Sequence, residues 1–312
     1  MMEEMRKVYA KTVELLYEND KNVFALEADL SSSMSTGGLK EKLGNNYINV
    51  GIMEANMIGI ASGLNLCGGY AFVHSFGQFI ARRAYDQLFI SLAYAGCNAC
   101  LVGSDAGVSA EHNGGTHMTF EDMGIIRNIP NIYIYDVCDP LQLKKILEDS
   151  YNNKRLVYIR TFRKAGKFSI YNSIDEIGDG ATLLKDKGNI TLIATGLAVH
   201  ECIEAAKKLE DSGINVKVID VHRIKPLNEK FVLNVIENDD VVITCENHSI
   251  NNGLGSTIAE LLSEKCPKKL VRLGVNNRFG QVGTLDYLLK DYNFDSDYIV
   301  NTIKSLKNNK NY

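Results

Sequence analysis

One carboxylate stands in an unusual setting near position 54 of this chain. Glu54 lies within residues 49–66, a stretch whose other members are mostly apolar or small. Burial disfavours the charged form of a carboxyl group and raises its pKa by up to several units. The setting therefore predicts that Glu54 can hold or share a proton near neutral pH, as protonation of a ring nitrogen requires. The alternative from this residue alone is a carboxylate at a helix N-terminus, stabilised by the helix dipole.

Two aromatic rings follow about twenty residues later. Phe76 and Phe79 are three residues apart in the segment 74–79. On spacing alone, such rings are more often core residues than ligand contacts. Together with a proton-bearing carboxyl group, however, two rings suit a flat heteroaromatic molecule such as an aminopyrimidine.

A third candidate is the imidazole of His117, which ends the sequence Gly114-Gly-Thr-His. Two consecutive glycines permit a sharp turn and a close backbone approach. An imidazole at such a turn can exchange protons near pH 7. The alternative is a loop histidine that only makes a local hydrogen bond.

The elements that must position these residues alternate between strands and helices. This alternation predicts an α/β fold of two domains, each a mainly parallel sheet with helices on both faces. The domains are expected at 1–165 and 189–312, joined by a polar linker at 166–188. Ligands bind at the carboxyl ends of strands in such sheets, where Asp29, Arg160 and the loop after Val102 are placed. The expected strands are 23–28, 47–50, 68–73, 99–102, 132–135, 156–160, 190–194, 216–220, 241–245 and 270–273; the expected helices are 5–18, 54–66, 79–92, 140–151, 199–212, 228–237, 255–265 and 295–307.

The composition excludes several classes of protein. A chain of 312 residues can form two domains, and its 45% apolar and 23% charged residues are typical of a soluble globular protein. The net charge of −4 argues against a nucleic-acid or anionic-membrane surface, which needs a basic excess. No apolar run is long enough to span a membrane. Seven scattered cysteines and an acidic N-terminus without a signal-peptide core favour a reduced, cytoplasmic protein.

Several motifs occur in an order that resembles the pyrimidine-binding domain of transketolases. They are residues 27–30, 47–66, 75–79, 83–88, 114–117 and 127–131, and the resemblance covers essentially the whole chain. Transketolases carry a diphosphate-binding half before this region, and this chain has none. The resemblance therefore implies a C-terminal half that is a separate subunit. Thiamine diphosphate would be shared with an N-terminal partner subunit that holds Mg²⁺, most simply in a heterotetramer of two copies of each chain.

The resemblance also implies roles for individual residues. Glu54 would bond the pyrimidine and promote loss of the thiazolium proton, between rings Phe76 and Phe79. His117 would lie over the thiazolium and contact the hydroxyl groups of the donor sugar. Three departures from the family are Arg82 at the position of a third aromatic, Asn113 at that of an aspartate, and Ser104 at that of a histidine. The predicted catalytic residues are Glu54 and His117, and the predicted cofactor-binding residues are Asp29, Glu54, Phe76, Phe79 and Arg82. The predicted substrate-binding residues are Arg6, Ser33, Asn113, His117 and Arg160. Of these, Arg6, Ser33 and Arg160 would hold the phosphate of the sugar.

Three motifs are interpreted as having no metal or phosphate role. Gly178-Asp-Gly lies in the linker without the rest of a metal motif, and Cys97 and Cys100 lack a second ligand pair for zinc. The loop 252–256 lacks the rest of a dinucleotide fingerprint.

The predicted activity is transfer of a two-carbon ketol unit from a ketose phosphate, or a similar anionic ketose, to an aldose phosphate. The alternatives are the beta subunit of a 2-oxo-acid dehydrogenase and a non-catalytic scaffold.

Overall fold

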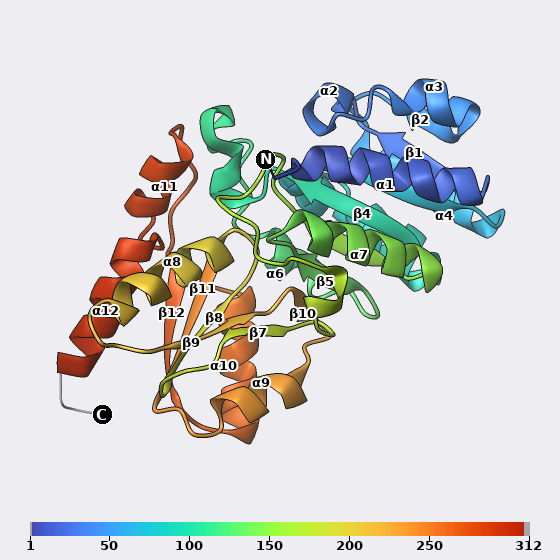
Figure 1. Ribbon diagram of the computed structural model, residues 1–312. Helices are drawn as coiled ribbons and strands as arrows, with labels where there is room; N and C mark the ends of the chain where they lie inside the picture. The colour runs from blue at the N-terminus through green and yellow to red at the C-terminus, as the bar shows by residue number, and fades with distance from the viewer. Residues whose placement is uncertain (1, 309–312) are drawn as a thin grey trace.

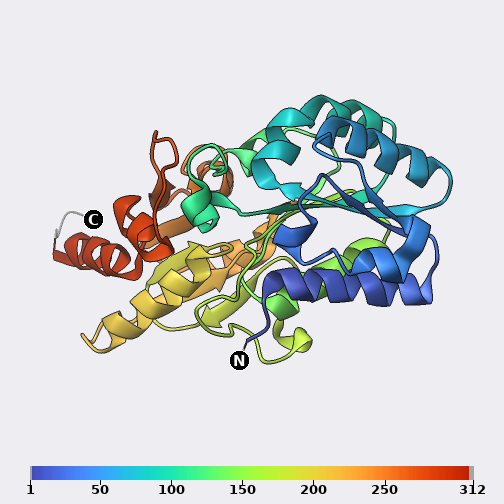
Figure 2. The same cartoon turned by 90° about the horizontal axis from the view of Figure 1, so that it is seen from above.

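The computed structural model describes residues 2–308, which form two α/β units (Figure 1). Seen from above, the first unit, blue to green, and the second, yellow to red, lie side by side (Figure 2). The first unit contains α1 (Met5–Asn19), β1 (Val23–Glu27), α2 (Ser31–Met34), α3 (Leu39–Leu43), η1 (Gly44–Asn46), β2 (Tyr47–Asn49), α4 (Glu54–Leu66), β3 (Tyr70–Phe76), η2 (Phe79–Arg83), α5 (Tyr85–Gln87), η3 (Leu88–Tyr94), β4 (Ala99–Ser104), η4 (Gly107–Asn113), α6 (Asp122–Ile126), β5 (Tyr133–Asp136), α7 (Pro140–Asn152) and β6 (Val157–Arg160).

The remaining elements follow along the second half of the chain. They are η5 (Ile174–Glu176), β7 (Thr182–Lys185), β8 (Ile190–Ala194), α8 (Ala198–Glu210), β9 (Lys217–Asp220), β10 (Arg223–Lys225), α9 (Glu229–Ile236), β11 (Val241–Ser249), α10 (Leu254–Lys265), β12 (Lys269–Val275), α11 (Leu285–Asp291) and α12 (Ser296–Asn308). The predicted fold class is therefore confirmed.

Both sheets are mainly parallel and covered by helices. The first has the strand order β10-β5-β6-β4-β3-β1-β2, and the second has β12-β11-β8-β9-β7. Antiparallel pairing occurs only between β10 and β5 and between β7 and β9 in the described residues. All seven residues of β3 are buried, as expected for a central strand with both faces covered. The carboxyl ends of β3, β4 and β6 lie next to one another, because β3 and β6 both pair with β4 in parallel register.

Two edge strands differ from the sequence-based boundaries. The segment 166–188, predicted as a linker, contains η5 and the strand β7, which pairs with β9. Its Lys- and Gly-rich composition concealed a short edge strand, and such strands are commonly short and polar. The strand β10 belongs to the second half of the chain but completes the first sheet beside β5. The second half of the chain therefore contributes one strand to the sheet of the first unit.

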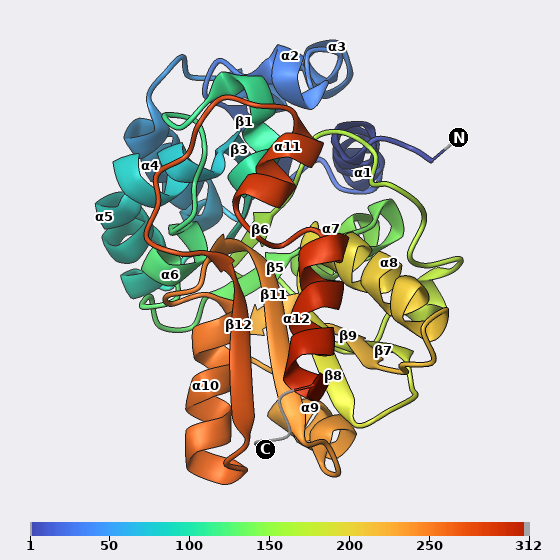
Figure 3. The same ribbon diagram turned by 90° about the vertical axis from the view of Figure 1, so that its left-hand side faces the viewer.

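The segment 79–92, predicted as one helix, is less regular than expected. It consists of the π-helix η2, the short helix α5 and a second π-helix, η3. A π-helix accommodates an extra residue within a helix and is frequent at functional sites. Figure 3 shows the second unit's α11 reaching the first unit, where it packs against η4. Within residues 2–308, no helix has both the length and the apolar character that a bilayer-spanning segment needs.

Candidate active site

Glu54 is the first residue of α4 and is only 1% exposed. One carboxylate oxygen accepts a hydrogen bond from the Ser75 hydroxyl at 3.1 Å. The other accepts one from Nη1 of Arg83 at 2.7 Å, and the Arg83 guanidinium also lies 4.2 Å from the Phe79 ring centroid. The buried carboxylate that the sequence predicts is therefore present, with a cationic partner that the sequence did not indicate. The sequence-based prediction named the adjacent Arg82 instead, and both arginines lie in the π-helix η2.

Three rings gather beside this carboxylate. The rings of Phe76 and Phe79 are stacked, with centroids 6.0 Å apart and an interplanar angle of 26°. The imidazole of His117 meets both rings edge-on, at 5.9 Å from Phe76 and 5.6 Å from Phe79. Phe76 is buried, whereas Phe79 and His117 are partly exposed. Ser75 joins Glu54 to the ring-bearing end of β3, so the structure brings together all four residues that carried the sequence argument.

These groups fit the pyrimidine end of thiamine diphosphate. A flat ring can pack on the aromatic faces, which prefer stacked or edge-on neighbours. A buried carboxyl group with its own hydrogen-bond partners can hold a fixed orientation toward a ring nitrogen. Residues 2–308 contain no group of three or more His, Cys, Asp or Glu side chains arranged for a metal ion.

The loop that carries His117 begins at the end of β4 and includes η4. Ser104, the last residue of β4, bonds His74 Nε2 at 2.9 Å. Asp105 follows with a left-handed backbone (φ 56°) and pairs with Arg163. Asn113 donates to the other carboxylate oxygen of Asp105 at 3.2 Å. Burial raises the pKa of Asp105, and the cation of Arg163 opposes that rise.

The structure does not support the prediction that Arg160 contacts substrate. Its side chain is fully buried, and Nε lies 3.0 and 3.1 Å from the two carboxylate oxygens of Asp122. Nη1 bonds Asp136 at 3.4 Å, and Nη2 donates to the carbonyl oxygens of Thr119 and Asn247 at 3.2 and 2.5 Å. The guanidinium therefore binds groups inside the molecule, between the two sheets. Arg160 is the last residue of β6 and lies in this interior, whereas Arg163 follows three residues after the strand has ended.

Arg163 is better placed than Arg160 for an anionic ligand. Its side chain is 25% exposed, and its guanidinium lies 5.6 Å from the Phe76 ring centroid. The sequence Arg160-Thr-Phe-Arg163 offered both arginines, and only their positions in the structure distinguish them. The backbone N–H of Arg6 donates to the carbonyl of Arg163 at 3.1 Å, which brings the N-terminal segment to this side of the site. The Arg6 side chain pairs with Glu4 at 3.0 Å.

The three remaining predicted residues are at least partly exposed to solvent. Asp29 is exposed, has a left-handed backbone (φ 62°), and donates its N–H to Asn49 at 3.1 Å. Ser33 is partly exposed in α2. Arg82 is half-exposed and pairs with Glu121 at 3.2 Å. Both residues of this pair line a cavity of about 350 Å³ between the two units, which the loop after β12 also borders.

An ionic cluster lies buried between the units, around Arg160. One guanidinium there faces two carboxyl groups, those of Asp122 and Asp136. Burial raises the pKa of Asp136 to about 7 despite the opposing Arg160 cation. Burial likewise raises the pKa of Glu246 to about 7, although two backbone N–H groups stabilise its charged form. Sequence reasoning had not singled out any member of this cluster other than Arg160.

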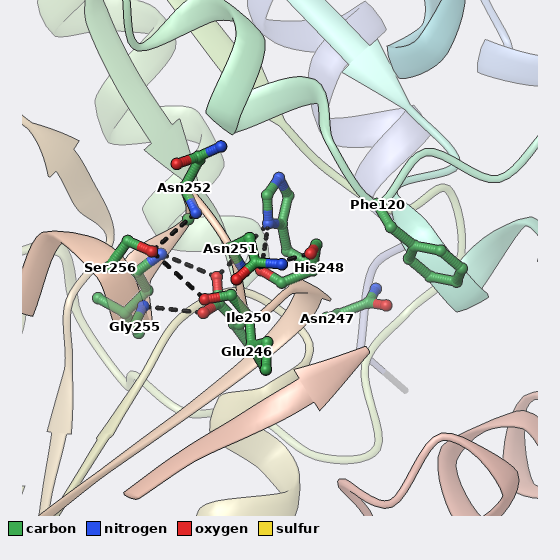
Figure 4. A network of polar contacts seen from close by, with 12 residues as sticks. Phe120, Glu246, Asn247, His248, Ile250, Asn251, Asn252, Gly255 and Ser256 are labelled. Atoms are coloured by element: carbon green, nitrogen blue, oxygen red, sulfur yellow. Dashed lines mark hydrogen bonds and ion pairs between the residues drawn. The ribbon is translucent and has the colours of Figure 1, made fainter. Parts of the chain in front are cut away.

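The glycine-containing loop before α10 and the Gly178-Asp-Gly motif both have internal partners. The N–H groups of Leu254 and Gly255 donate to the Glu246 carboxylate, each at 2.8 Å, so this helix N-terminus already binds an anionic group of the protein (Figure 4). Asp179 pairs with Arg223.

Comparison with known proteins places this geometry in a family. Residues 2–167 match the family model for the pyrimidine-binding domain of transketolase, and residues 179–299 match the one for its C-terminal domain. The 6-deoxy-6-sulfo-D-fructose transketolase subunit SqwH of Clostridium sp. strain MSTE9 is 40% identical over 99% of this chain and 96% of its own length. A putative transketolase C-terminal section of Methanocaldococcus jannaschii is 35% identical over 96% of this chain and 95% of its own length.

A longer relative and a solved structure support the same family. Human transketolase is 29% identical over 96% of this chain, but the match spans only 48% of the human protein. A structure described as a split-gene transketolase in an inactive beta4 tetramer superposes with a TM-score of 0.86, at 29% identity, and covers 98% of both chains. The chain therefore belongs to the transketolase family of ketol-group transferases, as a subunit with the pyrimidine-binding and C-terminal domains.

Proposed function

We propose that this chain is one half of a thiamine-diphosphate-dependent transketolase and acts with a separate diphosphate-binding subunit. The complex transfers a two-carbon ketol unit from an anionic ketose to an aldose phosphate. The observation that carries this proposal is the convergence of a buried carboxylate, Glu54, with the rings of Phe76, Phe79 and His117. A non-catalytic scaffold would not need this arrangement.

Each of these residues has a defined task in the proposed reaction. Thiamine diphosphate, when bound, supplies the carbanion chemistry, and the protein supplies orientation and proton transfer. Phe76 and Phe79 would hold the pyrimidine of the cofactor, and Glu54 would exchange a proton with one of its ring nitrogens. Two hydrogen bonds, one to each oxygen, orient the Glu54 carboxylate. His117, which contacts both rings, orients and deprotonates a hydroxyl group of the sugar.

The anionic end of the substrate is assigned to Arg163, with Arg6 beside it. A guanidinium group matches the oxygens of a phosphate in bidentate geometry. A sulfonate presents a similar tetrahedral set of oxygens with lower charge. The relative named for 6-deoxy-6-sulfo-D-fructose makes a sulfonated ketose a candidate donor beside a ketose phosphate. Asn113, which is exposed and bonded to Asp105, is proposed to contact a sugar hydroxyl from the same side.

The partner subunit would hold Mg²⁺ and the diphosphate. A diphosphate normally needs a metal ion to neutralise its charge, and the described residues offer no cluster for one. The solved relative described as an inactive beta4 tetramer supports a requirement for the second chain. The simplest closed assembly is a heterotetramer of two copies of each subunit. The free cysteines of the chain are compatible with a cytoplasmic setting.

The test is reconstitution from purified subunits. The chain alone, with Mg²⁺ and thiamine diphosphate, is expected to show no ketol transfer, and addition of the diphosphate-binding subunit should restore it. Donors should include a ketose phosphate, its sulfonated analogue and pyruvate. Transfer by the isolated chain would refute the split-enzyme proposal, and activity confined to pyruvate would favour a 2-oxo-acid dehydrogenase instead.

A further inference from the structure

The loop that carries His117 is held on three sides by the second unit of the chain. The loop runs from Ala106 to Phe120 and belongs to the first unit, between β4 and α6. Its contacts to the second unit involve backbone groups at its start, near His117 and at its end. The first two of these contacts depend on particular residue types in the second unit.

At the start of the loop, Asn247 contacts two backbone groups. Asn247 lies near the end of β11 (Figure 4) and is 1% exposed. Its side-chain oxygen accepts from the N–H of Val108 at 2.9 Å, and its side-chain NH₂ donates to the carbonyl of Ala106 at 2.8 Å. An asparagine amide has one acceptor oxygen and two donor hydrogens, so it can satisfy both groups at once. A side chain added at Gly107, between these two residues, would overlap the Asn247 amide.

Near His117 the two units meet backbone against backbone. A Cβ atom at Gly115 would lie 2.2 Å from the carbonyl oxygen of Gly280. A Cβ atom at Gly280 would lie 2.8 Å from both Gly115 Cα and Met118 Cβ. Such distances are shorter than carbon atoms tolerate in close-packed interiors. The loop 276–284 of the second unit can therefore approach His117 this closely only because both positions are glycine.

The end of the loop is fixed as well. The N–H of Ser249 donates to the carbonyl of Phe120 at 2.7 Å. The helix α11 packs on η4 from the outer side. The ring and cation contacts of Phe76 and Phe79 come from side chains of the first unit. The contacts of the second unit described above reach these rings through the loop that carries His117.

We propose that the C-terminal domain positions the His117 loop for catalysis, and that Asn247 and Gly280 are the positioning residues. This inference rests on the proposed function, because it takes His117 as the group that meets the sugar. A His117 displaced by about 1 Å would lose much of its contribution, since catalysis depends on near-attack geometry. The C-terminal domain would thus act on turnover without contacting cofactor or substrate.

The test combines hydrogen exchange with kinetics. Asn247→Ala removes both side-chain contacts, and Gly280→Ala forces the backbones apart while leaving Asn247 unchanged. In each variant of the full chain, backbone amides of residues 106–118 are expected to exchange about tenfold or more faster. For Asn247→Ala this follows from the loss of buried hydrogen bonds, and for Gly280→Ala from the separation of the two backbones. Amides of residues 54–66 should exchange at the wild-type rate. The matched controls are Asn251→Ala, with an exposed side chain, and Gly37→Ala, which has open space around it.

In the complex with the partner subunit, both variants should lower kcat about tenfold or more with unchanged affinity for thiamine diphosphate. Unchanged loop exchange in both variants would overturn the proposal, as would equally raised exchange throughout the chain. Normal kcat despite a loosened loop would also overturn it. If the wild-type complex showed no ketol transfer, the proposed function would fail, whereas the exchange result would still report whether the second unit holds the loop.

Discussion

Replacement of Glu54 by glutamine tests the centre of the proposed site. The substitution keeps the shape of the side chain and removes its titratable proton. The amide oxygen of the introduced glutamine can accept from Arg83 while its NH₂ group donates to the Ser75 hydroxyl oxygen, because a hydroxyl group both donates and accepts. Both contacts, seen at 3.1 and 2.7 Å, can therefore persist, but the contact with Arg83 is no longer an ion pair.

The effect on folding should be small. A hydrogen bond to a charged group contributes about 1.5–3 kcal/mol. The Arg83 side chain is 43% exposed and can bind water instead, which reduces the expected loss to roughly 1–2 kcal/mol. That is a minor part of a typical unfolding free energy of about 5–15 kcal/mol. Loss of a positioned acid or base, in contrast, typically costs about 10²–10⁴ in rate.

The assay has two readouts in the reconstituted complex at saturating thiamine diphosphate. Proton exchange at the thiazolium carbon, followed by NMR after acid quench, reports the task assigned to Glu54, and ketol transfer reports the whole reaction. Both should fall by about 10²–10⁴, while urea unfolding changes little. Arg83→Gln is the control, because it removes the cationic partner and keeps the carboxyl group; its loss should be much smaller. Near-wild-type exchange in Glu54→Gln would refute the assignment.

Three further predictions concern other parts of the molecule. His117→Ala should slow ketol transfer by about 10²-fold or more without weakening cofactor binding. Isothermal titration of the complex with thiamine diphosphate measures that binding, and a large loss of affinity with normal turnover would contradict the role of His117. Arg163→Ala should raise KM for an anionic ketose far more than for its uncharged analogue, and equal KM effects on both substrates would place the anion elsewhere. Arg160→Met, which leaves buried carboxyl groups without their cationic partner, should lower the free energy of unfolding by about 3–5 kcal/mol. Asp136 and Glu246 retain protons up to a pKa of about 7 in the folded chain, above their ordinary values, so their contribution to stability is present at acid pH and is lost as pH rises toward 7. Urea unfolding at several pH values should show this fall, and Asp136→Asn combined with Glu246→Gln should flatten it.

Much of the site was accessible from local sequence. The apolar setting of Glu54 predicted its burial, and Phe76 and Phe79, three positions apart, indicated a pair of rings suited to a flat heteroaromatic molecule; the structure stacks these two rings. The glycine turn before His117 predicted a loop in which an imidazole could approach other groups. These inferences succeed because burial and turn formation depend mainly on nearby residues, and because parallel strands bring their carboxyl ends together at one sheet edge.

The choice among neighbouring arginines was not accessible. Arg82 and Arg83 are adjacent in the π-helix η2, yet Arg83 pairs with Glu54 and Arg82 pairs with Glu121. Arg160 and Arg163 are three positions apart, yet one lies inside the interface and the other faces the site. The direction of a side chain depends on helix register and on the exact end of a strand. The types of the neighbouring residues do not specify helix register or the exact end of a strand strongly enough for either to be predicted from local sequence.

The two-domain α/β fold could be predicted from local patterns, because the alternation of apolar strands and amphipathic helices permits few other arrangements. The contacts that join the two domains could not be predicted in this way. The pairing of β10 with β5 joins residues nearly ninety positions apart. The Asn247 contacts and the close approach of Gly115 and Gly280 join residues more than a hundred positions apart. Such contacts follow from how two finished sheets pack, and no short stretch of sequence specifies that packing.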